Sequence, residues 1–142
     1  MSILSEMATY LDSKPNVRAA LNGRIFAGRA PQTIPMPYVL LTQLGAVHEY
    51  ATTGEITEVQ PTIQVDVFAR GPKGHLTASV IAERIRDAMS GYVGVMGTTT
   101  VQGCTIERDN ELVDLEADGS DDWVYQRSID YRLTHAQTAP AL

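Results

Sequence analysis

The chain has 142 residues and a formal net charge of −6, from 11 Lys and Arg against 17 Asp and Glu. This length suits one domain, which buries roughly 70% of the surface of the unfolded chain. The acidic balance argues against nonspecific binding to nucleic acid or anionic membranes, because both need basic patches. The one cysteine, Cys104, excludes an internal disulfide framework, and we interpret it as a buried thiol in a reduced compartment.

The ends and the hydropathy of the chain give no sign of a membrane segment. Residues 1–6 lack the basic stretch and apolar run of a signal peptide. No apolar run approaches the ~20 residues of a membrane span. We therefore expect a soluble protein that is cytoplasmic when it is made.

The first part of the chain predicts helix followed by extended structure. Residues 3–11 carry apolar side chains at helical spacing, and Ser2 can cap the helix. Residues 17–21 are compatible with another short helical turn. Three prolines within residues 31–37 exclude a helix and indicate an extended surface segment.

Two hairpins separated by a helix account for the rest. Residues 38–50 and 56–70 predict a first pair of strands, with a bulge at Gly45. Residues 98–115 and 123–134 predict a second pair.

A helix is predicted between the hairpins, over residues 75–90. Its expected apolar stripe consists of Leu76, Val80, Ile81, Ile85, Ala88 and Met89. The predicted fold class is α+β, with a mainly antiparallel four-stranded sheet of two hairpins and two helices on one face. The domain covers residues 1–135, and residues 136–142 form a flexible tail.

Residues 62–70 show the clearest pattern, a strict alternation of apolar and polar side chains. Ile63, Val65, Val67 and Ala69 are predicted to face the core, because alternate residues of a strand point to opposite faces. The other face mixes an amide, an acid, an aromatic ring and a base. Such a mixture predicts a surface that another protein covers.

The sequence contains no convincing catalytic or metal-binding motif. Asp114 to Gly119 imitates the start of a calcium loop, but position twelve is Tyr125 instead of glutamate. The three histidines have no spacing suited to metal ligation. We therefore predict a protein that is not an enzyme and that uses no cofactor or metal.

Acidic residues concentrate near the second hairpin. Residues 107–122 hold eight acids against Arg108, a net charge of −7. Two interpretations stay open: a solvated acidic loop, or a surface that repels or docks charged partners.

The order of several short segments resembles the tail completion, or tail terminator, family of long-tailed bacteriophages and gene-transfer particles. These segments are residues 24–26, 37–41, 64–69 and 127–132. The resemblance extends from about residue 4 to residue 133. It implies a virion structural protein that forms a ring, commonly a hexamer, at the head-proximal end of the tail tube. The implied partners are other copies of the chain, the major tail tube protein and the head-tail connector, and DNA passes through the lumen without specific binding.

From the resemblance and the strand pattern together we predict two sets of residues. The candidate subunit interface consists of Arg24, Gln64, Asp66, Phe68, Arg70, Asp130 and Arg132. The candidate acidic residues that face the lumen or the tube are Glu49, Glu55, Glu58, Asp114, Glu116, Asp118, Asp121 and Asp122. The alternatives are a head-completion or neck protein of the same connector region, and a small enzyme or metal-binding domain.

Overall fold

Three helices and six strands make up the described part of the chain. A computed structural model describes residues 2–50, 52, 56–114 and 124–136. The elements in chain order are α1 (Ile3–Asp12), α2 (Pro15–Leu21), β1 (Ile25–Ala27), β2 (Tyr38–Tyr50), β3 (Ile56–Arg70), α3 (Gly74–Met89), β4 (Gly94–Met96), β5 (Thr99–Asp114) and β6 (Val124–Ala136).

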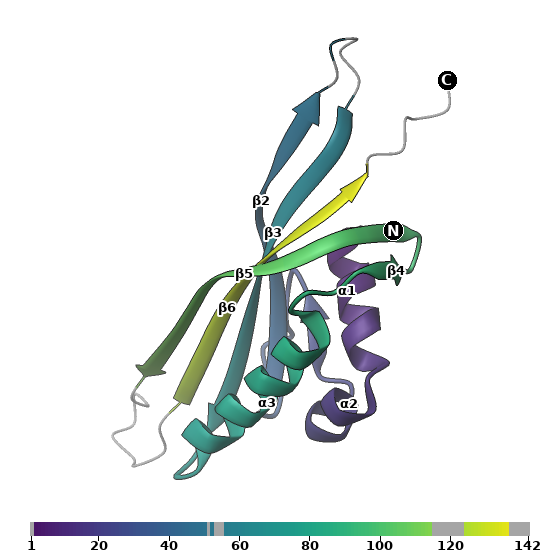
Figure 1. The fold of residues 1–142 in the computed structure, drawn as a ribbon. Helices are drawn as coiled ribbons and strands as arrows, with labels where there is room; N and C mark the ends of the chain where they lie inside the picture. The colour runs from purple at the N-terminus through teal and green to yellow at the C-terminus, as the bar shows by residue number, and fades with distance from the viewer. Residues whose placement is uncertain (1, 51, 53–55, 115–123, 137–142) are drawn as a thin grey trace.

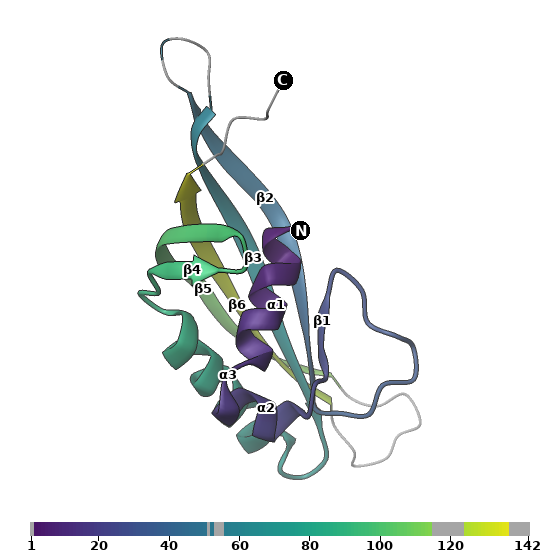
Figure 2. The same cartoon turned by 90° about the vertical axis from the view of Figure 1, so that its right-hand side faces the viewer.

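The strands form one sheet in the order β1-β2-β3-β6-β5-β4. β1 runs parallel to β2, and every other neighbouring pair is antiparallel. The sheet is strongly twisted, and all three helices lie on the same face of it (Figures 1 and 2). The other face carries no helix, so the long strands present an open face.

The predicted four-stranded antiparallel sheet with two helices is therefore wrong, although the α+β class is confirmed. The sheet is mixed and has six strands among the described residues, with three helices. The two missed strands, β1 and β4, have three residues each, which is too short for a periodic signal. Glycines around β4 resemble a connector, and only pairing with β5 makes it a strand.

Local signals explain the two N-terminal helices. The Oγ of Ser2 accepts a hydrogen bond from the backbone N–H of Ser5 (3.2 Å), which caps α1 as predicted. α2 starts at Pro15, where a missing N–H costs nothing, and ends at Asn22 in the left-handed conformation (φ 49°). No helix in the described ranges is long and apolar enough to cross a membrane.

The predicted apolar stripe of α3 is partly confirmed, because Ile81, Ile85 and Met89 are buried and Ala88 packs against the core. The buried residues of the helix are Gly74, Ala78, Ile81, Ala82, Ile85 and Met89, at helical spacing. Leu76 and Val80 are instead 62% and 43% exposed. The prediction failed there because small residues, which carry little hydropathy signal, let the helix lie close to the sheet. At Gly74, an added Cβ would lie only 2.7 Å from the ring of Tyr125.

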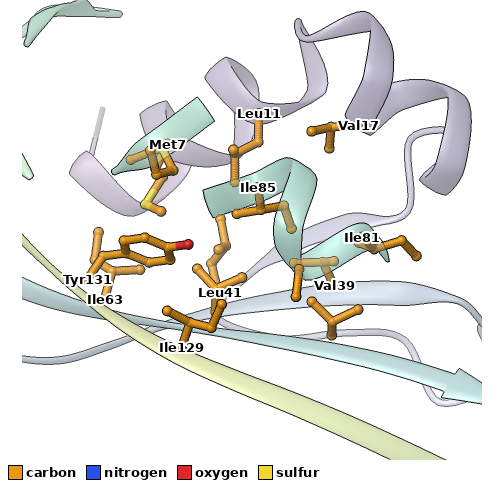
Figure 3. Packing of buried hydrophobic residues seen from close by; sticks show 14 of the residues in the cluster. Met7, Leu11, Val17, Val39, Leu41, Ile63, Ile81, Ile85, Ile129 and Tyr131 are labelled. Atoms are coloured by element: carbon orange, nitrogen blue, oxygen red, sulfur yellow. The ribbon is translucent and has the colours of Figure 1, made fainter. Parts of the chain in front are cut away.

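The core lies between the helices and the sheet (Figure 3). Ile63, Val65, Val67 and Ala69 of β3 are all at most 1% exposed, which confirms the predicted core face. Tyr131 of β6 is fully buried with them, and the other members include Met7, Leu11, Val39, Leu41, Ile81, Ile85, Ile129 and Leu133. Burial of this apolar surface is the main stabilising contribution to the fold.

A buried carboxylate connects α1 to the turn between β4 and β5. The side chain of Glu6 is 1% exposed, and its Oε1 accepts hydrogen bonds from the backbone N–H (3.2 Å) and the hydroxyl of Thr98. Burial raises the pKa of Glu6, but hydrogen bonds from Thr98 and Thr99 outweigh it, so the pKa lies below its ordinary value of 4.5. Gly97, at φ 62°, leaves space for this contact, because a Cβ there would lie 2.8 Å from the Glu6 Cγ.

This contact predicts a pH-dependent contribution to stability. Because the folded-state pKa of Glu6 is depressed, its contribution is present above the unfolded pKa and is lost as the pH falls through the folded value. The substitution Glu6→Gln should lower the free energy of unfolding by about 1–2 kcal/mol at neutral pH, and by much less at about pH 3. Urea unfolding at both pH values measures the difference. Glu83→Gln, an exposed acid on α3, is the control, and an equal effect of both substitutions would contradict the role of Glu6.

Candidate functional site

The open face of the sheet brings most of the predicted interface residues together. Across β2, β3 and β6, the register aligns Tyr38 with Phe68 and Gln126, Leu40 with Asp66 and Ser128, and Thr42 with Gln64 and Asp130. These residues alternate with the buried ones and therefore lie on the face away from the helices. Arg70 and Arg132, at the two ends of this array, pair with Val124 and Thr62 across β3 and β6.

A hydrogen-bond network lies at the centre of this face. The Nε2 of Gln64 donates to the Oγ of Ser128 (2.8 Å) and to the Oδ1 of Asp66 (3.0 Å). The Nε2 of Gln126 donates to the same oxygen of Asp66 (3.1 Å). Asp66 is 7% and Ser128 is 6% exposed. Asp66 is therefore a fixed acceptor that holds the face rigid, and it is not a charge extended toward solvent.

Aromatic rings continue the face toward β1. Tyr38 stacks on Phe68 at 4.8 Å between ring centroids, and Phe26 meets Tyr38 edge-on at 6.3 Å. Such pairs add about 0.5–1.5 kcal/mol beyond the burial of their area. Phe68 thus lies within a row of three rings across β1, β2 and β3.

Arg24 lies where β1 begins, beside this aromatic row. Its Nε donates to the carbonyl of Pro37 (2.8 Å), and its own carbonyl accepts from the N–H of Val39 (2.9 Å). Arg24 therefore fixes the loop that leads into β2.

Charges gather at the other end of the open face. Burial raises the pKa of Asp130, and the nearby acids Asp66 and Glu107 raise it further, against the effect of Arg108. Arg132 forms an ion pair with Glu107 (2.9 Å).

Two β-bulges lie on either side of the central strands at this end. β2 shifts register between Gln43 and Gly45, which confirms the predicted bulge, and β5 shifts between Ile106 and Arg108. Bulges bend the strand that carries them. Between them the open face has a hollow of about 370 Å³, lined by Leu44, Gly45, Ala46, Val47, Gln60, Thr62, Glu107, Arg108 and Asp130.

Three acids in the described part of the acidic segment have local partners, two of them arginines. The guanidinium of Arg127 binds both carboxylate oxygens of Asp109 (2.7 and 3.0 Å), and the pKa of Asp109 is lowered mainly by this hydrogen bond. His75 contacts Glu111 at 2.7 Å. With the Glu107–Arg132 pair, three of the eight acids therefore have a local partner.

The predicted acidic lining is only partly visible. Glu49 and Glu58 are register partners near the end of the first hairpin, and like charges that face each other across strands repel. The Nε2 of Gln60 donates to the Oε1 of Glu58 (2.7 Å). The side chain of Asp114 and the residues Glu55, Glu116, Asp118, Asp121 and Asp122 lie outside the described part, so their orientation stays a prediction.

The open face is an ordered surface of hydrogen-bonded and aromatic side chains. Cys104 is 3% exposed, and burial raises its pKa to about 12, so its thiol is protonated and inert at neutral pH. Within the described ranges no three His, Cys, Asp or Glu side chains converge as metal ligands. Sequence reasoning missed the buried Glu6 and the supporting residues Ser128 and Gln126, since only strand register places the latter two beside Asp66.

The sheet has one face under the helices and one ordered open face, and this architecture by itself fixes no function. Residues 5–135 match the model of the family "Tail completion protein gp17", and the chain belongs to this family of virion structural proteins. The resemblance that the sequence suggested is thereby confirmed.

Comparison with solved structures agrees in fold. A chain of the "Virion of native gene transfer agent (GTA) particle" superposes with a TM-score of 0.77 at 15% identity, covering 96% of each chain. A second solved protein, whose name states no function, has a TM-score of 0.54 at 14% identity, covering 99% of this chain and 100% of its own. No curated protein matches significantly.

The network on the open face predicts a stability effect of one carboxylate. Asp66→Ala leaves the amides of Gln64 and Gln126 without their shared acceptor, so the free energy of unfolding should fall by about 1–3 kcal/mol. Urea unfolding measures this loss. Asn110→Ala, an exposed residue on β5, is the control, and an Asp66→Ala variant as stable as the control would show that the network contributes nothing.

Proposed function

We propose that the protein forms a ring, commonly of six copies, that caps the head-proximal end of the tail tube, stops its polymerisation and joins the tail to the head connector. The observation that carries the proposal is the family match over residues 5–135. The rigid open face supports it, because a subunit that binds copies of itself and two different partners needs preformed surfaces.

The open face is the proposed contact surface. Phe68, Arg70, Asp130 and Arg132 present an aromatic ring, two bases and an acid along one side of the sheet. Gln64 and Asp66 support this surface through their hydrogen bonds, and Arg24 fixes its border. The tube protein and neighbouring copies of the chain are the proposed occupants.

The proposal is tested with the purified chain and the major tail tube protein of the same particle. Electron microscopy should show rings of the chain alone, and rings at one end of each tube in the mixture. Tubes should stop growing when the chain is added, because the ring covers the end at which subunits join. Rings at a head connector but never on tubes would instead support a head-completion or neck protein. Monomers that leave tube growth unchanged would contradict both.

The acidic residues are proposed to face the lumen or the tube, since clustered carboxylates repel the phosphates of passing DNA. Replacing Asp114, Asp118, Asp121 and Asp122 with Asn and Glu116 with Gln should leave ring formation intact. DNA delivery should decrease, because the neutralised surface no longer repels phosphate. Delivery measured on assembled particles checks this expectation, and unchanged assembly with unchanged delivery would refute the acidic lining. A variant with two exposed acids of α3 replaced, Glu83→Gln and Asp87→Asn, is the control.

A further inference from the structure

The strand β2 has a long edge that no other described strand covers. β1 pairs only with Val39–Leu41, and the N–H of Gly28 donates to the carbonyl of Leu41 (2.7 Å). Residues 42–50 pair with β3 on one side, and on the other side no strand of the described ranges reaches them. An edge of this length is a template for another strand.

The opposite side of the sheet has a second open edge, on β5. β4 pairs only with Thr99–Val101, and the N–H of Gly91 donates to the carbonyl of Cys104 (2.9 Å). Residues 105–114 have β6 on one side and no described strand on the other. The two open edges have nearly equal lengths and lie on opposite sides of one subunit.

Exposed apolar side chains concentrate on the β2 edge. Leu44, Val47 and Tyr50 are 53%, 46% and 64% exposed. They are three of the seven large hydrophobic side chains exposed among the described residues, yet they lie within the seven residues 44–50. Such a concentration marks a contact surface.

Strand directions make the two edges compatible. β2 is antiparallel to β3, β3 to β6, and β6 to β5, so β2 and β5 run in opposite directions. When two copies lie side by side in the same orientation, β2 of one therefore meets β5 of the next as an antiparallel pair. Two different edges that meet in this way give a head-to-tail contact, which rotation can close into a ring.

The charges are also compatible. Residues 42–47 contain no charged side chain. On β5, Glu107 pairs with Arg132 and Asp109 pairs with Arg127, each within its own subunit. The uncharged residues 42–47 can therefore approach β5 without leaving these acids unpaired, and Glu49 is the one acid among residues 42–50.

The offset between the edges fits a closed ring of tilted strands. The middle of the β5 edge, Asp109, aligns through Ile129 and Val65 with Leu41 of β2, whereas the middle of the β2 edge is Ala46. The path from β2 of one copy to β2 of the next crosses four strands, so five residues of offset correspond to a strand tilt of roughly 40°, within the ~35–45° of closed barrels.

We propose that residues 42–50 of one copy add as an antiparallel strand to residues 105–114 of the next copy, so that the sheets join into one continuous ring. This proposal rests on the proposed ring and identifies its subunit contact as strand-to-strand pairing.

A pair of matched valines tests the contact. Val47 on β2 and Val80 on α3 have similar exposure, 46% and 43%, so lysine at either position should leave the folded subunit intact. Val47→Lys places a charge on the pairing edge and should weaken association about tenfold or more, as measured by analytical ultracentrifugation. Val80→Lys should leave association unchanged. Equal behaviour of the two variants would overturn the proposed pairing.

Cysteine cross-linking tests the register in a Cys104→Ser background. Val47→Cys combined with Arg108→Cys or Asn110→Cys places both thiols on the open face, so oxidation should give a ladder of cross-linked copies. Val47→Cys combined with Glu111→Cys places them on opposite faces and should give none.

The outcomes separate this contact from the proposed function. Rings that cap tubes but show no cross-linked ladder overturn the strand pairing and leave the tube-capping function standing. A ladder from a protein that never caps tubes supports the pairing and removes the capping function.

Discussion

The structure depends on the alternation of β3. Its odd-numbered residues from Ile63 to Ala69 are at most 1% exposed beneath the helices, so its even-numbered residues must lie on the opposite face. β2 and β6 pair along both sides of β3 and follow the same division. A shift of one residue would expose the core and bury Gln64 and Asp66, and therefore the buried side fixes what the open face presents.

The same sheet has a rigid open face and two strand edges that are only partly paired among the described residues. The open face is held by the amides around Asp66 and by the stacked rings of Tyr38 and Phe68. The long strands β2 and β5, in contrast, extend beyond the short strands β1 and β4 that pair with their outer edges. A subunit with a fixed surface and two unfinished edges suits an assembly in which each copy completes the next, because little ordering remains to be done on binding.

Several charged side chains on this sheet interact with side chains of their own subunit. Glu107 and Asp109 each contact an arginine of their own subunit, and Glu111 contacts His75, so the acidity of residues 107–122 is partly compensated. Glu6 likewise has a local structural role in the core, where its carboxylate accepts a hydrogen bond from Thr98 and fixes the turn. The other five acids of the segment are Asp114, Glu116, Asp118, Asp121 and Asp122.

The sequence by itself determined the long strands, the two longer helices, the core face of β3 and the family. The helices, the strands and the core face come from periodicity and capping, which neighbouring residues encode, and the family comes from its resemblance to several short segments in order along the chain. Only the tertiary structure decided that Ile25–Ala27 and Gly94–Met96 are strands, that Leu76 and Val80 face outward, and that Gln126 and Ser128 hold Asp66. The physical reason is that these features depend on residues far away in the sequence. A three-residue strand needs a strand to pair with, a helix lies close to the sheet only where small residues face it, and the side chains around Asp66 come from about 60 residues further along the chain. No local sequence pattern identifies these distant residues.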